Sequence, residues 1–157
     1  MINMSDEFYE EVADKFIFKV RKGLLYDEND VWTKINDGEA QFGATDFLQR
    51  RGGDVVFVDL PKKGSAVKRG EEIFSFETIK AVVAIASPFD GVIKEVNTTL
   101  SEKPELINEN PYGEGWIALI SLSHPEEDQR SLLTAEQYFE LMKSKIKNEQ
   151  KRSIKEA

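Results

Sequence analysis

The stretch from Val31 to Ile120 is a succession of short strand-like runs separated by turn sequences. The runs are rich in β-branched and aromatic residues, which favour strands, and the turns contain Gly, Pro, Asp and Asn. In chain order the runs read VWTKI, EAQFGAT, DVVFVDL, EIFSFE, VVAIA, VIKEV and GWIALISL, and the turns between them include NDG, RRGGD, PKKG, KRGEE, SPFDG and PYGEG. Short strands with turn signals at this spacing predict a mainly β domain, either a sandwich or a barrel.

Two further segments are expected to form helices that flank the β domain. Over residues 5–20, Ser5 is a candidate cap and the apolar residues Phe8, Val12 and Phe16 recur every four positions, as on one face of a helix. From Thr134 onward, Thr134 and Gln137 have the spacing of a capping box. The apolar stripe of this second helix consists of Tyr138, Leu141, Met142 and Ile146. We therefore expect an N-terminal helical extension (1–22), a β domain (23–133) and a C-terminal helix with its tail (134–157).

Composition excludes several classes of function. The net charge of −8 argues against nucleic acid as a partner, because binding to phosphate backbones needs clustered Lys and Arg. No apolar run approaches the roughly 20 residues that span a bilayer, and the acidic N-terminus is unlike a secretory signal, so we expect a cytoplasmic protein. With no cysteine and a single histidine, the sequence offers neither a thiolate nucleophile nor a metal site. Any redox chemistry must come from an attached group.

Lys80 is the one basic side chain between Glu71 and Ile93, the most strand-like part of the chain. Phe74 and Phe76 share one face of the run before it, and the run after it alternates in the same way. This period of two predicts a half-buried hairpin with Lys80 at its tip.

A lysine at a hairpin tip has three possible roles. It can be an ordinary surface residue, or a catalytic lysine, although a catalytic lysine is usually desolvated in a pocket. A lysine that serves as a covalent attachment point needs the opposite: exposure and a fixed location. Glu77, three residues earlier, is either a recognition handle for a modifying enzyme or an ordinary carboxylate at a strand end.

Four stretches in the same order resemble motifs of the glycine cleavage system H protein family. FETIKA resembles the lipoylation motif E-S-x-K-A, and DVVFVDLPKKG resembles G-D-x-V-F-V-x-L-P-x-x-G. SPFDGVIKEVN is similar to A-P-x-S-G-x-I-x-x-V-N, and LSEKPELINENPYGEGWI is similar to L-x-x-x-P-x-L-I-N-x-x-P-Y-x-x-G-W-I. The resemblance extends from about Leu24 to Lys145. The tip lacks the M-K-M of biotin carriers, and the lipoyl domains of dehydrogenase complexes lack the P-Y-x-x-G-W-I segment.

The resemblance implies a barrel-sandwich hybrid of the lipoyl/biotinyl type, with lipoate joined to Lys80 by an amide. The attaching enzymes would be a lipoate ligase, or an octanoyltransferase with a lipoyl synthase, with Glu77 as a recognition residue. A protein of this family is a carrier and not a catalyst. It takes an aminomethyl group from a pyridoxal-phosphate glycine decarboxylase to an aminomethyltransferase and is reoxidised by a dihydrolipoyl dehydrogenase.

The chain departs from the family pattern beside the arm. Where the family has H-E-W, this chain has Asp30-Val31-Trp32, and Ala84 stands where the family has an aspartate four residues after the lysine. Both carboxylates that would hold a loaded amine are therefore missing. In one interpretation the cargo is still aminomethyl, Asp30 compensates, and Val31→Glu would improve its retention. In the other, the chain serves heterodisulfide-reductase-like sulfur-oxidising enzymes and the arm carries a sulfur intermediate, which suits an apolar cleft.

Overall fold

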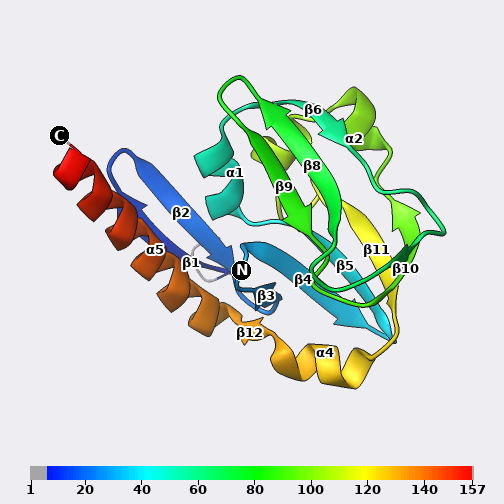
Figure 1. Cartoon of the computed structure of the whole chain (residues 1–157). Helices are drawn as coiled ribbons and strands as arrows, with labels where there is room; N and C mark the ends of the chain where they lie inside the picture. The colour runs from blue at the N-terminus through cyan, green and yellow to red at the C-terminus, as the bar shows by residue number, and fades with distance from the viewer. Residues whose placement is uncertain (1–6, 157) are drawn as a thin grey trace.

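A computed structural model describes residues 7–156 of the chain, with side chains up to residue 152. Its strands form a 7-stranded sheet in the order β12-β3-β4-β5-β11-β10-β7, a 3-stranded sheet in the order β6-β8-β9, and a separate hairpin of β1 and β2. The smaller sheet faces the larger one, and the hairpin lies between helix α5 and the rest of the fold (Figure 1).

The strand bounds are β1 Phe8–Ala13, β2 Phe16–Arg21, β3 Leu25–Asp27, β4 Val31–Asn36, β5 Glu39–Ala44, β6 Val55–Asp59, β7 Ala66–Val67, β8 Glu72–Thr78, β9 Val82–Ala86, β10 Gly91–Val96, β11 Ala118–Leu122 and β12 Leu133–Thr134. The helices are α1 Asp46–Gly52, α2 Thr99–Glu102, α3 Leu106–Glu109, α4 Pro125–Ser131 and α5 Ala135–Glu156. The expected mainly β architecture is confirmed.

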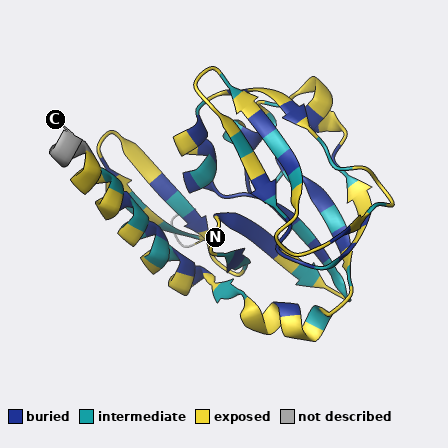
Figure 2. Ribbon diagram, in the orientation of Figure 1, coloured by how far each residue is buried: buried dark blue, intermediate teal, exposed yellow. Residues whose placement is uncertain are grey.

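The main hydrophobic core lies between the two larger sheets. Because side chains alternate between the two faces of a strand, each sheet turns one row of apolar residues towards the other. The buried cluster that results includes Phe74 and Phe76 of β8, Ile85 of β9, and Phe42 and Ile120 of the facing sheet. All five side chains are at most 2% exposed. Buried and exposed residues accordingly alternate along the strands in Figure 2.

The N-terminal segment is a β-hairpin, so the expected helix over residues 5–20 is wrong. Strands β1 and β2 pair antiparallel from Phe8↔Arg21 to Ala13↔Phe16, with Asp14 in the left-handed region (φ 54°) at the turn. The helical interpretation failed because a spacing of four fits a strand as well as a helix: it is twice the strand period of two. The alternation of Phe16, Phe18 and Val20 along β2 carried the correct signal. Ser5, the expected cap, lies outside the described residues.

The expected C-terminal helix is confirmed, including its capping box. The backbone nitrogen of Gln137 donates to Thr134 Oγ1 (3.2 Å), and the backbone nitrogen of Thr134 donates to Gln137 Oε1 (3.0 Å). The buried stripe of α5 packs with the N-terminal hairpin and β3 in a second hydrophobic cluster, in which the rings of Tyr26 and Tyr138 stack at 4.6 Å. No helix within residues 7–156 is long and apolar enough to cross a membrane.

Candidate functional site

Lys80 lies in the turn between β8 and β9, as the sequence predicts, and its side chain is exposed. Thr78 determines the shape of this turn. Its hydroxyl accepts hydrogen bonds from the backbone nitrogens of Lys80 (3.2 Å) and Ala81 (3.0 Å), and its own backbone nitrogen donates to the carbonyl of Ala81 (2.9 Å). A threonine hydroxyl that replaces backbone partners in this way fixes a tight turn. The lysine is thus presented from a defined position.

The side chain of Lys80 lies along Gly53, in the loop after α1. A Cβ atom at Gly53 would come within 2.8 Å of Lys80 Cε, and the backbone there has φ +93°, which side chains rarely adopt. Glycine therefore leaves room for the lysine chain at this point. The sequence RRGGD marked a turn there but gave no sign of the contact with Lys80.

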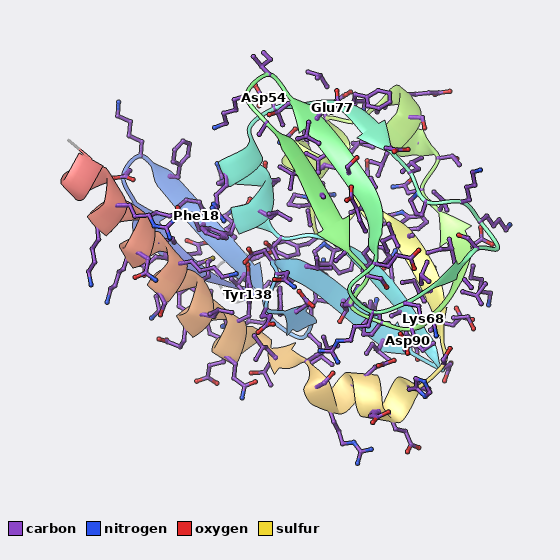
Figure 3. All side chains as sticks on the ribbon, in the orientation of Figure 1. Phe18, Asp54, Lys68, Glu77, Asp90 and Tyr138 are labelled. Atoms are coloured by element: carbon purple, nitrogen blue, oxygen red, sulfur yellow. The ribbon has the colours of Figure 1, made fainter. Side chains whose placement is uncertain are left out.

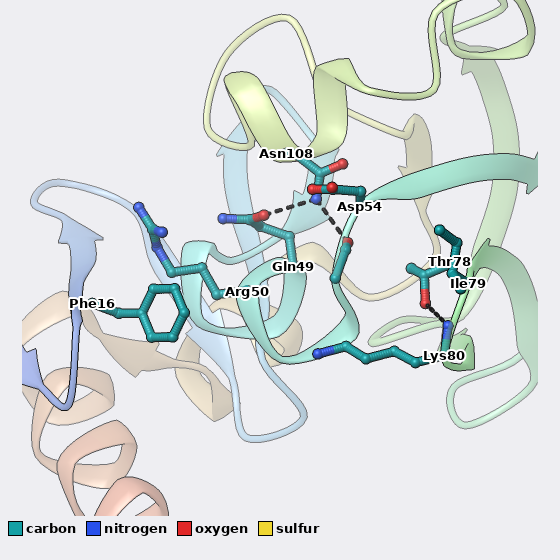
Figure 4. A pocket seen from close by; sticks show the side chains of 9 residues that line it. Phe16, Gln49, Arg50, Asp54, Thr78, Ile79, Lys80 and Asn108 are labelled. Atoms are coloured by element: carbon teal, nitrogen blue, oxygen red, sulfur yellow. Dashed lines mark hydrogen bonds between the residues drawn. The ribbon is translucent and has the colours of Figure 1, made fainter.

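Lys80 borders an open pocket with a volume of about 420 Å³. That volume is within the range of about 300–1,000 Å³ typical of small-molecule sites. Figure 4 shows the side chain of Lys80 extending towards the end of α1. The lining residues come from β2, from α1 and the loop after it, from the β8–β9 turn and from α3: Phe16, Gln49, Arg50, Gly53, Asp54, Thr78, Ile79, Lys80 and Asn108.

Asn108 holds the pocket floor together. Its amide nitrogen donates to Gln49 Oε1 and to the carbonyl oxygen of Gly53, both at 2.9 Å, and its amide oxygen accepts from the backbone nitrogen of Val55 at 2.9 Å. One side chain of α3 thereby connects the end of α1, the glycine loop and the start of β6. The loop opposite Lys80 is fixed in position by these bonds.

Two charged residues besides Lys80 line the pocket. Arg50 forms an ion pair with Asp46 (Nε to Oδ2, 3.3 Å) in the first turn of α1, so its charge is partly balanced. Asp54 is exposed and is the one carboxylate among the described residues that line the pocket. Figure 3 places Asp54 and Glu77 at the same end of the molecule. Removal of the Lys80 charge by amidation would leave Asp54 with a negative charge beside the arm.

Glu77 is exposed on β8, outside the pocket. In the 3-stranded sheet it is paired with Phe57 of β6 and Val82 of β9, which are 55% and 67% exposed. The carboxylate therefore lies between two exposed apolar residues near the tip. A role for Glu77 in recognition by a lipoylating enzyme stays a prediction.

The three residues expected to form the arm cleft are not brought together beside Lys80. Val31 is 1% exposed and belongs to the main core, and Ala84 is exposed on β9. Neither lines the pocket.

Asp30 has a structural role in this fold. Its Oδ1 accepts from the hydroxyl of Tyr138 (2.7 Å) and from Lys145 Nζ (2.9 Å), both on α5. Burial and the charge of Asp30 raise the pKa of Tyr138 well above its ordinary value, so the phenol stays a donor. Asp30 does not line the pocket beside Lys80, and a part for it in compensating for the missing carboxylates stays a prediction.

Sequence reasoning missed Phe16, Arg50, Asp54 and Asn108 as pocket residues. A signal existed for two of them, because Asp54 and Asn108 fall within the stretches DVVFVDL and PELINENP that resemble family motifs. Phe16 and Arg50 fall in no such motif. Among the residues that the structure describes, His, Asp and Glu form no group of three or more that could hold a metal ion.

Comparison with known proteins agrees with this geometry. The family model described as glycine cleavage H-protein matches residues 24–145. A probable glycine cleavage system H protein of Aeropyrum pernix is 48% identical over 128 residues, which are 82% of this chain and 89% of that protein. The glycine cleavage system H protein 4 of Aquifex aeolicus is 35% identical over 137 residues, which are 87% of this chain and 80% of that protein.

A solved structure supports the same assignment. The crystal structure of a glycine cleavage system H protein from Mycobacterium marinum superposes with a TM-score of 0.67 at 33% identity, covering 73% of this chain and 92% of that one. Family model, relatives and fold therefore agree. The chain belongs to the glycine cleavage H-protein family, whose members are non-catalytic carrier subunits with a lipoate attached covalently to a lysine.

Proposed function

We propose that Lys80 is the lysine that carries the lipoyl group and that the chain shuttles an aminomethyl group between enzymes of glycine cleavage. The observation that carries this proposal is the position of Lys80. It is exposed at the tip of a turn fixed by Thr78, beside an open pocket, within the segment that matches the family.

The residues present fit a lipoyl group. Lys80 supplies the amine for the amide bond, and Gly53 leaves room for an arm that leaves the turn towards the pocket. The lipoyl group would supply the two redox-active sulfurs that a chain without cysteine lacks. Its attachment would be the work of a lipoate ligase, or of an octanoyltransferase and a lipoyl synthase, in the cytoplasm.

Asp54 supports an aminomethyl cargo. An aminomethyl group ends in an ammonium ion, which a nearby carboxylate stabilises. The family's usual carboxylate positions hold Val31 and Ala84 in this chain, which leaves Asp54 as the carboxylate that lines the pocket. The positive charge of Arg50, which would repel an ammonium ion, is partly balanced by Asp46. The partners would be a pyridoxal-phosphate glycine decarboxylase, an aminomethyltransferase and a dihydrolipoyl dehydrogenase.

Loading the lipoylated protein with glycine labelled at its methylene carbon tests the proposal. With a glycine decarboxylase present, we expect the protein to retain label, and we expect Asp54→Asn to release it about two- to fivefold faster, as for the loss of an exposed ion pair. Asp59→Asn is the matched control, because Asp59 is an exposed aspartate at the far end of β6, the strand that Asp54 precedes, and it lies outside the pocket. Failure of the wild type to load, while a known H protein loads under the same conditions, would reject the aminomethyl cargo.

A sulfur cargo is the second candidate, and the missing carboxylates favour it. Val31 is buried, Ala84 carries no charge, and Asp30 is bonded to Tyr138 and Lys145. Partners in that case would be heterodisulfide-reductase-like sulfur-oxidising enzymes. Incubation of the lipoylated protein with thiosulfate or sulfide-derived sulfur distinguishes the two. A mass increase on the arm, together with no loading from glycine, would select the sulfur cargo.

A further inference from the structure

The pocket beside Lys80 has a wall that lies outside the segment matching the family. Phe16, the first residue of β2, lines this pocket together with Lys80, yet it precedes residues 24–145. Its side chain is 49% exposed, and the guanidinium of Arg50 lies over its ring at 5.8 Å from the centroid. Figure 4 shows Phe16 and Arg50 on the side of the pocket towards which the Lys80 chain extends.

The hairpin that bears Phe16 is fixed to the pocket floor through Asp46. The Oδ2 of Asp46 accepts from the backbone nitrogen of Lys19 on β2 (2.9 Å) and from Arg50 Nε, while its Oδ1 accepts from Gln49 Nε2 (2.8 Å). One buried carboxylate thus connects β2 to two residues that line the pocket. The hairpin therefore has a defined position relative to the pocket.

Packing reinforces the same placement. The rings of Phe18 and Phe47 meet edge to face at 5.6 Å, and the hydroxyl of Tyr112 donates to the carbonyl of Lys19 (2.6 Å). Both contacts join β2 to parts of the chain within the matched segment. Phe16 is therefore the exposed end of an anchored strand.

We infer that Phe16, together with the guanidinium of Arg50 over its ring, forms the far wall of the site that receives the dithiolane end of the lipoyl arm. The inference rests on the proposed attachment of lipoate to Lys80. An acyl chain attached to Nζ continues the direction of the lysine side chain, away from Gly53 and across the pocket. Sulfur makes favourable contacts with aromatic rings, and the half-exposed ring offers such a contact. Phe16 is thus a positioning residue for the resting arm.

The reactivity of the reduced arm provides a direct test. Because the chain contains no cysteine, the thiols of the reduced arm would be the only thiols in the protein, and their reaction with Ellman's reagent reports their accessibility. We expect Phe16→Ala to raise the rate of this reaction about two- to tenfold. Ile17→Ala is the matched control, because Ile17 is the next residue on β2, is 44% exposed and does not line the pocket. It should leave the rate unchanged.

The outcomes separate this inference from the proposed function. Mass spectrometry first establishes whether Lys80 carries a lipoyl group. If it does, but Phe16→Ala reacts at the wild-type rate or Ile17→Ala gives an equal change, the role of Phe16 as a wall of the arm site is rejected and the carrier role stands. If Lys80 bears no lipoyl group, both fall. Phe16→Tyr, which keeps the ring, should react at the wild-type rate, and a rate equal to that of Phe16→Ala would also contradict the inference.

Discussion

At the scale of single residues, Thr78 and Gly53 together determine how Lys80 is presented. The threonine hydroxyl shapes the turn, and the glycine leaves space for the lysine chain to lie against the loop after α1. Neither contribution is visible in the hairpin pattern of the sequence. That pattern predicts where the lysine lies but not the direction of its side chain.

Resemblance to the family suggests a glutamate in place of Val31, but we expect this substitution to destabilise the fold. It is 1% exposed within the main core, so Val31→Glu would bury an unpaired charge. We expect the free energy of unfolding, measured by urea denaturation, to fall by about 3 kcal/mol or more. Lys34→Gln, at an exposed position of the same strand, should change it by less than about 0.5 kcal/mol. A stable Val31→Glu variant that retains the loaded amine longer would contradict this account.

Asp128 provides a test of pH dependence. Its Oδ2 is buried without a hydrogen-bond partner in the described part of the chain, and burial raises the pKa of this carboxyl above its ordinary value of 3.8. Protonation is then easier in the folded state. Its contribution to stability is therefore greatest below pH 3.8 and is lost as pH rises through the raised pKa.

The comparison of wild type with Asp128→Asn isolates this contribution. Between neutral pH and about pH 4, we expect the difference in unfolding free energy to shift in favour of the wild type as the pH falls. Neighbouring charged groups act on this pKa in both directions. His124 and Arg69 lower it, against the effect of burial, and Asp90 and Glu127 raise it further. A difference that stays constant over this range would show that Asp128 titrates alike in the folded and unfolded chain.

At the scale of elements, α5 is attached to the β domain by a buried polar cluster at Tyr138. The Tyr138 hydroxyl donates to Asp30 and lies 3.1 Å from Thr45 Oγ1, at the start of α1. Lys145, two turns further along α5, also reaches Asp30. One helix thereby holds the loop before β4 and the cap of α1 in place.

Tyr138→Phe removes the hydroxyl and keeps the stacked ring. We expect the free energy of unfolding to fall by about 1–3 kcal/mol, because the change withdraws a hydrogen bond from a buried carboxylate. Urea denaturation monitored by the circular dichroism of the fold measures the effect. Tyr9→Phe, at a ring that stacks on Phe139 and is only partly buried, is the control. Equal stability of wild type and Tyr138→Phe would show that the cluster contributes nothing.

The elements differ in how far local sequence determines them. The strands between Val31 and Leu122 are rich in β-branched and aromatic residues and are separated by turn residues, and Thr134 and Gln137 form the expected capping box, so these parts were predictable. The short helices α1, α2 and α3 within the same stretch were not predicted. The segment from Phe8 to Arg21 was not, because its spacing of four fits either type of element and nothing local shows that α5 offers a surface for a hairpin.

At the scale of the whole molecule, the site is assembled from segments far apart in the chain. Lys80 could be identified from its own hairpin, but the pocket combines β2, the end of α1, the β8–β9 turn and α3. No periodicity reports that these segments meet. For the same reason, the sequence placed Asp30 beside the arm, whereas in the structure its carboxylate accepts hydrogen bonds from Tyr138 and Lys145 of α5. The attachment point could thus be predicted from the sequence, and its surroundings required the fold.

The most direct test of the central claim is the mass of the protein after co-expression with a lipoate ligase and lipoate. We predict that the intact mass increases by one lipoyl group, that peptide mapping locates it on Lys80, and that Lys80→Arg abolishes the increase. Lys94→Arg, which changes an exposed lysine of β10, should leave it intact. An unmodified Lys80, under conditions that lipoylate a known carrier protein, or a lipoyl group on another lysine, would contradict the account.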